Sequence, residues 1–160
     1  MNEEARIREA LESAETIAVV GCSPNPMRPS NEIASYLLEA GYRVVPVNPG
    51  HREILGQPCY RSLEDIPGEI RVDIVDVFRR SEHVAAIAEQ AIARKVPFVF
   101  AQLGVVDRAA ARRLEESGIG VAMDRCILIE HRRLGIGPKS KSRNAGSKTR
   151  VPSMSRNGTT

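Results

Sequence analysis

The loop Gly21–Ser30 contains the residue types that bind an anion. It follows an apolar, β-branched run that is typical of a parallel strand buried on both faces. Gly21 lets the backbone turn and approach a ligand closely. Arg28 supplies a guanidinium, and Ser30 is expected to cap the following helix, so that free N–H groups and the guanidinium face one phosphate. The loop therefore predicts a phosphorylated ligand.

The spacing of small residues in this loop departs from the common nucleotide motifs. A dinucleotide fingerprint needs G-x-G-x-x-G, but Ser23 and Pro26 occupy the second and third glycine positions. The next strand, Arg43–Val47, ends in Asn48 and Pro49 instead of the carboxylate that binds a free ribose diol. No G-K-[ST] Walker sequence occurs in the chain. These absences argue against a dinucleotide-binding regulator, which we keep as an alternative.

Strand and helix patterns alternate along the chain, as they do in stacked βαβ units. Right-handed crossovers then give a single Rossmann-like, doubly wound α/β domain with a mainly parallel five-stranded sheet. The predicted strands are Thr16–Val20, Arg43–Val47, Ile74–Val77, Phe98–Ala101 and Val121–Met123, with a short extended piece at Gln57–Tyr60. The predicted helices are an amphipathic one from Asn2 to Glu15, Asn31–Ala40, Glu82–Lys95 capped by Ser81, and Asp107–Ser117 capped by Asp107.

In such a fold the ligand crevice lies beyond the carboxyl ends of the strands, at a topological switch point. Four strand ends carry groups that suit a ligand there: Gly21, Ser23 and Arg28; residues 46–49; residues 76–80; and Gln102, Leu103 and Gly104. Arg28 with Arg79 or Arg80 supplies charge-assisted contacts to more than one phosphate. Val47 and Phe78 offer apolar walls for a purine.

Charge is distributed unevenly along the 160 residues, which suffice for one domain. Residues 138–160 hold six Lys/Arg and no acid, which leaves 17 Lys/Arg against 20 Asp/Glu in residues 1–137. We expect a folded domain over residues 1–137 and a basic, disordered tail over residues 138–160. The tail is the element expected to make weak contact with a polyanion such as nucleic acid. No apolar run is long enough for a membrane span, and no signal peptide is evident, so we expect no membrane contact and a cytoplasmic location.

The cysteines Cys22, Cys59 and Cys126 form no C-x-x-C pair, and their number is odd. Neither a zinc knuckle nor a disulfide framework is indicated, so we expect reduced thiols and no metal. Cys22 lies in the proposed phosphate loop, where the helix dipole and Arg28 would lower its pKa. The simpler interpretation is that Cys22 is a small side chain that fills space. The more specific hypothesis is that its thiol forms a mixed disulfide with a ligand that carries a thiol.

Candidates for catalysis are few. Cys126 with Asp124 and His131 permits a thiol nucleophile, but a packed thiol beside an ion pair of Asp124 and Arg125 explains the same residues. Asp73 and Asp76 are three residues apart around one strand and therefore point to opposite faces, which disfavours an acid/base dyad. We expect a binding module without catalysis of its own, and an enzyme that uses the thiol of Cys22 or Cys126 is the alternative.

Several blocks of the chain, in order, resemble the small stand-alone CoA-binding proteins, whose domain is similar to the CoA-binding domain of the succinyl-CoA synthetase alpha subunit. The resemblance covers about residues 10–134. It runs through residues 20–23, 28–30, 41–49, 72–79, 102–104 and 123–126. The basic tail and Cys22, where an aliphatic residue is common, depart from the family pattern.

The resemblance implies that coenzyme A, or an acyl-CoA, binds at the strand ends. It places Gly21, Cys22, Ser23, Arg28 and Ser30 near the phosphates. It places Val47, Asn48 and Pro49 near the adenosine, with Phe78 and Arg79 continuing that wall, and Gln102, Leu103 and Gly104 toward the pantetheine arm. The synthetases carry their catalytic machinery on further domains, so the resemblance implies binding and not a reaction.

Overall fold

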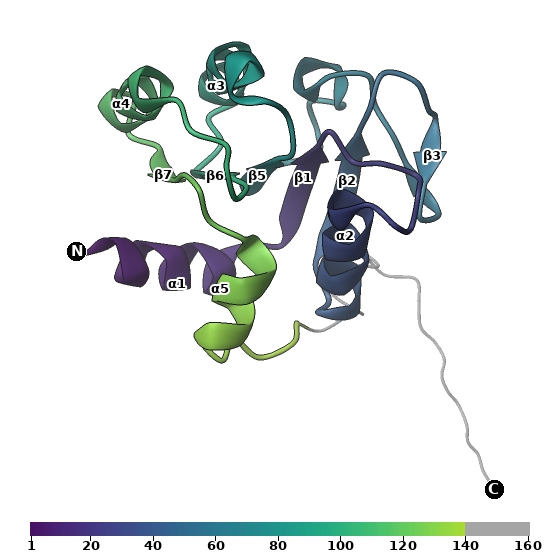
Figure 1. Ribbon diagram of the computed structural model, residues 1–160, viewed down its shortest axis with the longest axis horizontal. Coiled ribbons are helices and arrows are strands. Elements are labelled where there is room, and N and C mark those ends of the chain that lie inside the picture. Colours follow the sequence, from purple (N-terminus) through teal and green to yellow (C-terminus); the bar gives the residue numbers. More distant parts are fainter. Residues whose placement is uncertain (140–160) are drawn as a thin grey trace, which may run out of the picture.

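The computed structural model describes residues 1–139 and confirms the doubly wound α/β arrangement (Figure 1). Five parallel strands form one sheet in the order β2-β1-β5-β6-β7. The strands are β1 (Thr16–Val20), β2 (Arg43–Val47), β5 (Ile74–Val77), β6 (Phe98–Ala101) and β7 (Gly120–Ala122). A small antiparallel pair, β3 (Glu53–Ile54) and β4 (Gln57–Pro58), follows β2. The first four predicted sheet strands are confirmed, and β7 begins one residue earlier than predicted.

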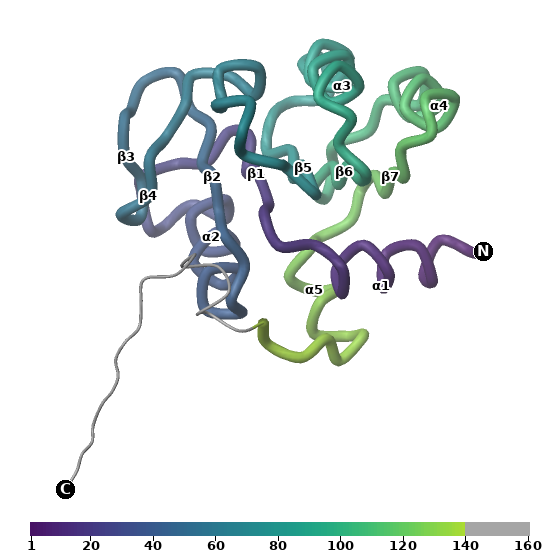
Figure 2. Tube along the Cα trace, turned by 180° about the vertical axis from the view of Figure 1, so that it is seen from behind, coloured from purple at the N-terminus to yellow at the C-terminus, as the bar shows by residue number. Residues whose placement is uncertain are grey.

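Two helical layers cover the sheet, and this is why its strands are apolar on both faces. All residues of β1, β5 and β6 are buried. One layer holds α1 (Glu3–Ser13), α2 (Pro29–Glu39) and α5 (Ile127–Arg133). The other layer holds α3 (Val84–Ala93) and α4 (Arg108–Glu116). Seen from behind, α1 and α5 lie side by side below the β7 end of the sheet (Figure 2).

Helix boundaries differ from the predictions where capping was misread. Helix α2 begins at Pro29 and not at Asn31, because proline's fixed φ suits the first helical position. Ser81 does not cap a helix; it opens the short 3-10 helix η2 (Ser81–His83), and its hydroxyl accepts the Val106 N–H at 3.0 Å. The predicted cap Asp107 is confirmed, since its carboxylate accepts the Ala110 N–H at 3.0 Å.

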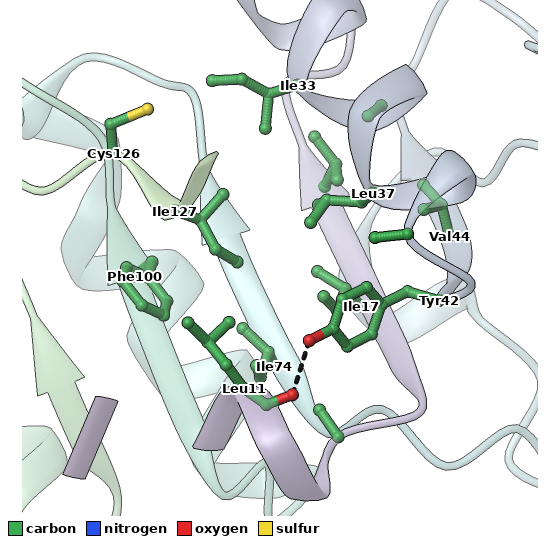
Figure 3. Close-up of a cluster of buried hydrophobic side chains, with 14 of the residues drawn as sticks. Leu11, Ile17, Ile33, Leu37, Tyr42, Val44, Ile74, Phe100, Cys126 and Ile127 are labelled. Carbon is green, nitrogen blue, oxygen red and sulfur yellow. Dashed lines mark hydrogen bonds between the residues drawn. The ribbon is translucent and has the colours of Figure 1, made fainter. Parts of the chain in front are cut away.

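Helix α5 was not predicted, although it closes one face of the core. Its Ile127 is fully buried, together with Ile17, Leu37 and Phe100 of the same cluster (Figure 3). In the same cluster the Tyr42 hydroxyl donates to the carbonyl of Leu11 at 2.5 Å. Burial and the charge environment raise the pKa of Tyr42, so this hydroxyl keeps its proton.

His131 joins α5 to α2 at the edge of this core. Its Nδ1 is 2.8 Å from the hydroxyl of Tyr36, and its ring makes edge-on contacts with Tyr36 and Tyr42. The residue is 4% exposed, and its Nε2 has no hydrogen-bond partner among residues 1–139. Burial, and secondarily the charge of Lys139, lower the pKa of His131 below its ordinary value.

This burial predicts a loss of stability on acidification. The unfolded chain takes up a proton near pH 6.5 and the folded chain only at lower pH, so stability is full above pH 6.5 and falls below it. The free energy of unfolding then falls by at most about 1.4 kcal/mol per pH unit for this one proton. We expect the His131→Phe variant to lose the part of the stability decrease below pH 6.5 that protonation of His131 causes. Thermal unfolding at several pH values measures this difference. His83→Gln, at a half-exposed histidine, is the control and should keep the wild-type profile. Parallel profiles for wild type and His131→Phe would contradict the assignment.

The last described residue, Lys139, contacts the amino-end side of the sheet. Its N–H donates to the Ala40 carbonyl at 2.7 Å, and its ammonium donates to the Glu12 carbonyl at 2.6 Å. The ammonium also lies 5.3 Å from the centre of the Tyr42 ring. The predicted tail over residues 138–160 therefore lies outside the described residues except for Pro138 and Lys139. Within residues 1–139, no helix combines the length and hydropathy that crossing a membrane requires.

Candidate ligand-binding site

The topological switch point of the sheet lies between β1 and β5. The chain leaves β1 for β2 on one side of it and returns to β5 on the other side. The Phe78 N–H donates to the carbonyl of Val20 at 2.7 Å, so the two strand ends stay paired to the edge of the sheet. In an open α/β sheet, ligands bind in the crevice at this position.

Gly21 brings the loop after β1 against the loop after β5. Its φ is +89°, and a Cβ built on it would stand 2.9 Å from the carbonyl carbon of Phe78 and 3.0 Å from Cδ of Arg79. Its N–H and that of Cys22 both donate to the carbonyl of Val47, at 2.9 and 3.2 Å. Only glycine allows this close approach, which gathers the ends of β1, β2 and β5 at one place.

The loop between Gly21 and Pro29 uses its backbone N–H groups internally, which differs from the expected anion cradle. The Ser30 hydroxyl accepts the Ser23 N–H at 2.9 Å, so it does not cap α2. The side chain of Ser23 accepts the Asn25 N–H at 3.0 Å, and that of Asn25 accepts the Met27 N–H at 2.9 Å. Positions 24, 26 and 29 are prolines without an N–H. Recognition of a phosphate here must therefore rely on side chains.

Arg28 is the cation of this loop. It stands at the residue before α2, is exposed, and its guanidinium forms no hydrogen bond or ion pair with any residue in 1–139. Arg79, half-buried beside Gly21, and Arg80, exposed, have likewise no such partner in the described chain. By contrast, Arg113, Arg125 and Arg133 elsewhere on the surface are paired with glutamates. Three uncommitted guanidinium groups thus follow β1 and β5, and they are available to an anionic ligand.

The residues after β2 act mainly as a brace. The Asn48 side chain donates from Nδ2 to the Cys22 carbonyl at 2.8 Å and accepts the Gly50 N–H at 2.8 Å. Val47 is buried, whereas Pro49 is exposed. Of the predicted adenosine wall, therefore, Pro49 is open to a ligand, while Val47 and Asn48 hold the neighbouring loop in place.

A pocket of about 490 Å³ opens beyond the ends of β5 and β6. The sequence predicted Phe78, Arg79, Gln102, Leu103 and Gly104 of its lining. It missed Ser81 and Val105, although they directly follow residues 78–80 and 102–104 in the chain. The pocket is lined by Phe78, Arg79, Arg80, Ser81, Gln102, Leu103, Gly104 and Val105. Gly104 is held by its N–H, which donates to the Asp124 carboxylate at 2.7 Å. The volume lies in the range of small-molecule sites.

A second pocket, of about 530 Å³, lies at the opposite edge of the sheet. Its lining includes Arg6 of α1, and Asp73, Phe98 and Gly120 at the amino ends of the strands. Asp73 is already engaged, because its carboxylate accepts the N–H groups of Glu15 and Thr16, each at 3.0 Å. The carboxyl edge is the better candidate, since it combines the switch point, the close approach at Gly21 and the uncommitted arginines.

The thiols do not have the environment of a nucleophile. Cys22 is fully buried, and burial raises the pKa of its thiol to about 12, the reverse of the expected lowering. Cys126 is 7% exposed and packs in the core. The predicted ion pair between Asp124 and Arg125 is wrong: Asp124 binds the Gly104 N–H, and Arg125 pairs with Glu3 and Glu130.

Comparisons with known proteins identify the domain. A family model described as "CoA binding domain" matches residues 15–132. The uncharacterized protein YneT of Bacillus subtilis is 42% identical over 127 residues, which are 79% of this chain and 93% of that protein. A hypothetical protein from Pyrococcus horikoshii OT3 is similar in structure, with a TM-score of 0.78 and 40% identity over 84% of this chain and 92% of the other.

A part of the chain also matches a much larger enzyme. It is 39% identical over 69 residues to the ADP-forming acetate–CoA ligase I of Archaeoglobus fulgidus. The match covers 43% of this chain but 10% of the ligase, so the similarity concerns one part of that enzyme.

Proposed function

The chain belongs to the family of CoA-binding domains, and from this premise we propose that it binds coenzyme A, free or acylated, at the carboxyl ends of β1, β2, β5 and β6. The observation that carries the proposal is the meeting of the ends of β1, β2 and β5 at the switch point, where Gly21 packs against Phe78 and Arg79. We place the phosphates beside Arg28 and Arg79, the adenosine along Pro49, and the pantetheine arm along Gln102, Leu103 and Gly104.

Electrostatics support this orientation. CoA carries a diphosphate and a 3′-phosphate, and a guanidinium that lacks a protein partner binds such groups bidentately. Arg28 stands in the loop after β1, at the residue before α2, and Arg79 stands beside Gly21, so in this arrangement the two contact different phosphates. Ser30 contributes through its hydroxyl, which accepts the Ser23 N–H and still has its own O–H to donate to a phosphate.

The domain acts as a binding module in this proposal. The buried Cys22 thiol, with its raised pKa, and the packed Cys126 do not support a thiol enzyme. Weak polyanion contact through the basic residues near the carboxyl terminus, and a cytoplasmic location, are further parts of the proposal that rest on the sequence.

Mass spectrometry of the protein under non-denaturing conditions tests which ligand it retains. We expect the purified protein to carry, or to take up from a mixture of CoA, acetyl-CoA and NAD, an adduct with the mass of CoA or its acetyl ester. An adduct with the mass of NAD, or none after incubation with the mixture, would contradict the proposal.

A further inference from the structure

Asp76 is a buried acid in the middle of the central strand. It is fully buried, and neither carboxylate oxygen has a hydrogen-bond partner among residues 1–139. A buried polar group without a partner is unfavourable, and proteins rarely retain one without a functional reason. Burial raises the pKa of the Asp76 carboxyl well above its ordinary value, so the group keeps its proton and can donate as well as accept a hydrogen bond.

A second unpartnered oxygen lies nearby on the same face of the sheet. Asp76 is level with Phe100 in the register of β5 and β6. Because side chains alternate along a strand, Gln102 shares the face of Phe100, one step closer to the carboxyl edge. The Oε1 atom of Gln102 is buried and also has no partner within residues 1–139. Gln102 lines the pocket beyond β5 and β6, and Asp76 lies on the same face of the sheet one step further from the carboxyl edge, in the core.

The two groups are complementary to an amide. A protonated carboxyl donates to an amide carbonyl, and the Gln102 oxygen accepts from an amide N–H. A nucleotide consists of phosphates, sugar and base, whereas the pantetheine arm of CoA carries amides on a narrow flexible chain. Phe78 shares this face of β5 and, like Gln102, lines the pocket, so contact between a ligand in the pocket and the fully buried Asp76 requires these two side chains to move apart.

We propose that Asp76 and Gln102 form a subsite for an amide of the ligand's pantetheine arm, and thereby make the site specific for CoA over nucleotides without such an arm. The Asp76 carboxyl donates to the amide carbonyl, and Gln102 accepts the amide N–H. The proposal rests on the proposed function, because it takes the ligand to be CoA.

The test compares two ligands, CoA and adenosine 3′,5′-bisphosphate, which lacks the arm, by calorimetry on the full chain. We expect Asp76→Val to weaken CoA binding about tenfold, the effect of leaving one buried ligand group unpaired, and to leave binding of the bisphosphate unchanged. Gln102→Leu should act in the same way. Asp76→Asn should retain most of the CoA affinity, since its amide both donates and accepts.

Thermal unfolding of each variant accompanies the titrations. Asp76→Val should be at least as stable as wild type, since it removes an unpartnered polar group, and weaker binding is then not a result of unfolding. Wild-type CoA affinity in Asp76→Val, or an equal loss for both ligands, would overturn the subsite. If the wild type binds both ligands but binds CoA no more tightly than the bisphosphate, the subsite is contradicted and the proposed function is not. If it binds neither, the proposed function fails and the subsite with it.

Discussion

Replacing Gly21 by alanine is expected to destabilise the domain by on the order of 3 kcal/mol and to abolish CoA binding. The added methyl group would meet the Phe78 carbonyl, which belongs to the backbone at the end of β5 and cannot rotate away. The positive φ of Gly21 adds strain for any side chain. Relief requires the loop after β1 to separate from β5, which opens the switch point where we place the diphosphate. Denaturant unfolding and calorimetry measure the two effects.

Gly118→Ala is the matched control. Gly118 has a similar φ of +82°, but a Cβ there meets no atom within 4 Å. We expect this variant to lose about 1 to 2 kcal/mol from backbone strain and to keep the CoA affinity of the wild type. A Gly21→Ala protein that is as stable as Gly118→Ala and still binds CoA would show that the close approach is not required.

Arg28→Ala is expected to lose about 1.5 to 3 kcal/mol of CoA binding free energy, the range for a hydrogen bond to a charged group. Because Ser23, Asn25 and Ser30 already satisfy the loop N–H groups, the backbone cannot replace the missing guanidinium. Arg28→Lys should recover part of the loss, since an ammonium supplies charge but not two parallel N–H donors. Calorimetry at fixed salt concentration measures these differences.

Arg112→Ala controls for the loss of one surface charge. Arg112 is also exposed but lies on α4, on the other layer of the domain. This variant should bind CoA as the wild type does. If the Arg28→Ala protein remains folded and binds CoA with the affinity of the wild type, the loop has a structural role and does not bind the phosphates.

The sheet was predictable because each strand is a short apolar run between polar segments. Thr16–Val20, Arg43–Val47, Ile74–Val77 and Phe98–Ala101 appear in the structure with the predicted bounds. Helix α5 was missed because it is seven residues long, its periodic pattern is short, and its last turn is His131, Arg132 and Arg133. Its stability comes from packing Ile127 into the core, which a local pattern does not reveal.

The hydrogen bonding of the loop after β1 could not be predicted from residue types. Ser30 is a suitable capping residue by type, but its hydroxyl turns back to Ser23, and Ser23 and Asn25 bond locally in the same way. Such choices depend on the three-dimensional path of the loop, which the close approach at Gly21 fixes. Arg28 was predictable as a phosphate ligand from its residue type. Because the N–H groups of the loop are bonded internally, the proposed phosphate contact of the loop depends mainly on this guanidinium.

Asp76 shows a different limit of the sequence. An acid within the apolar run Ile74–Val77 was visible, and its position three residues from Asp73 disfavoured a dyad. That it is fully buried and unpartnered depends on the helices that cover the sheet on both faces. The sequence predicted the edge of the sheet at which we place the ligand, and the covering helices determine which polar groups remain without a partner beneath it.

Titration calorimetry of the wild-type protein with CoA, dephospho-CoA and NAD at one salt concentration tests the central claim most directly. We expect CoA to bind more tightly than NAD, because we place its phosphates beside Arg28 and Arg79 and because no carboxylate follows β2 to bind a free ribose diol. Dephospho-CoA, which lacks the 3′-phosphate, should bind less tightly than CoA. Equal affinity for all three compounds, or no binding of CoA, would contradict the assignment of this edge of the sheet as a CoA site.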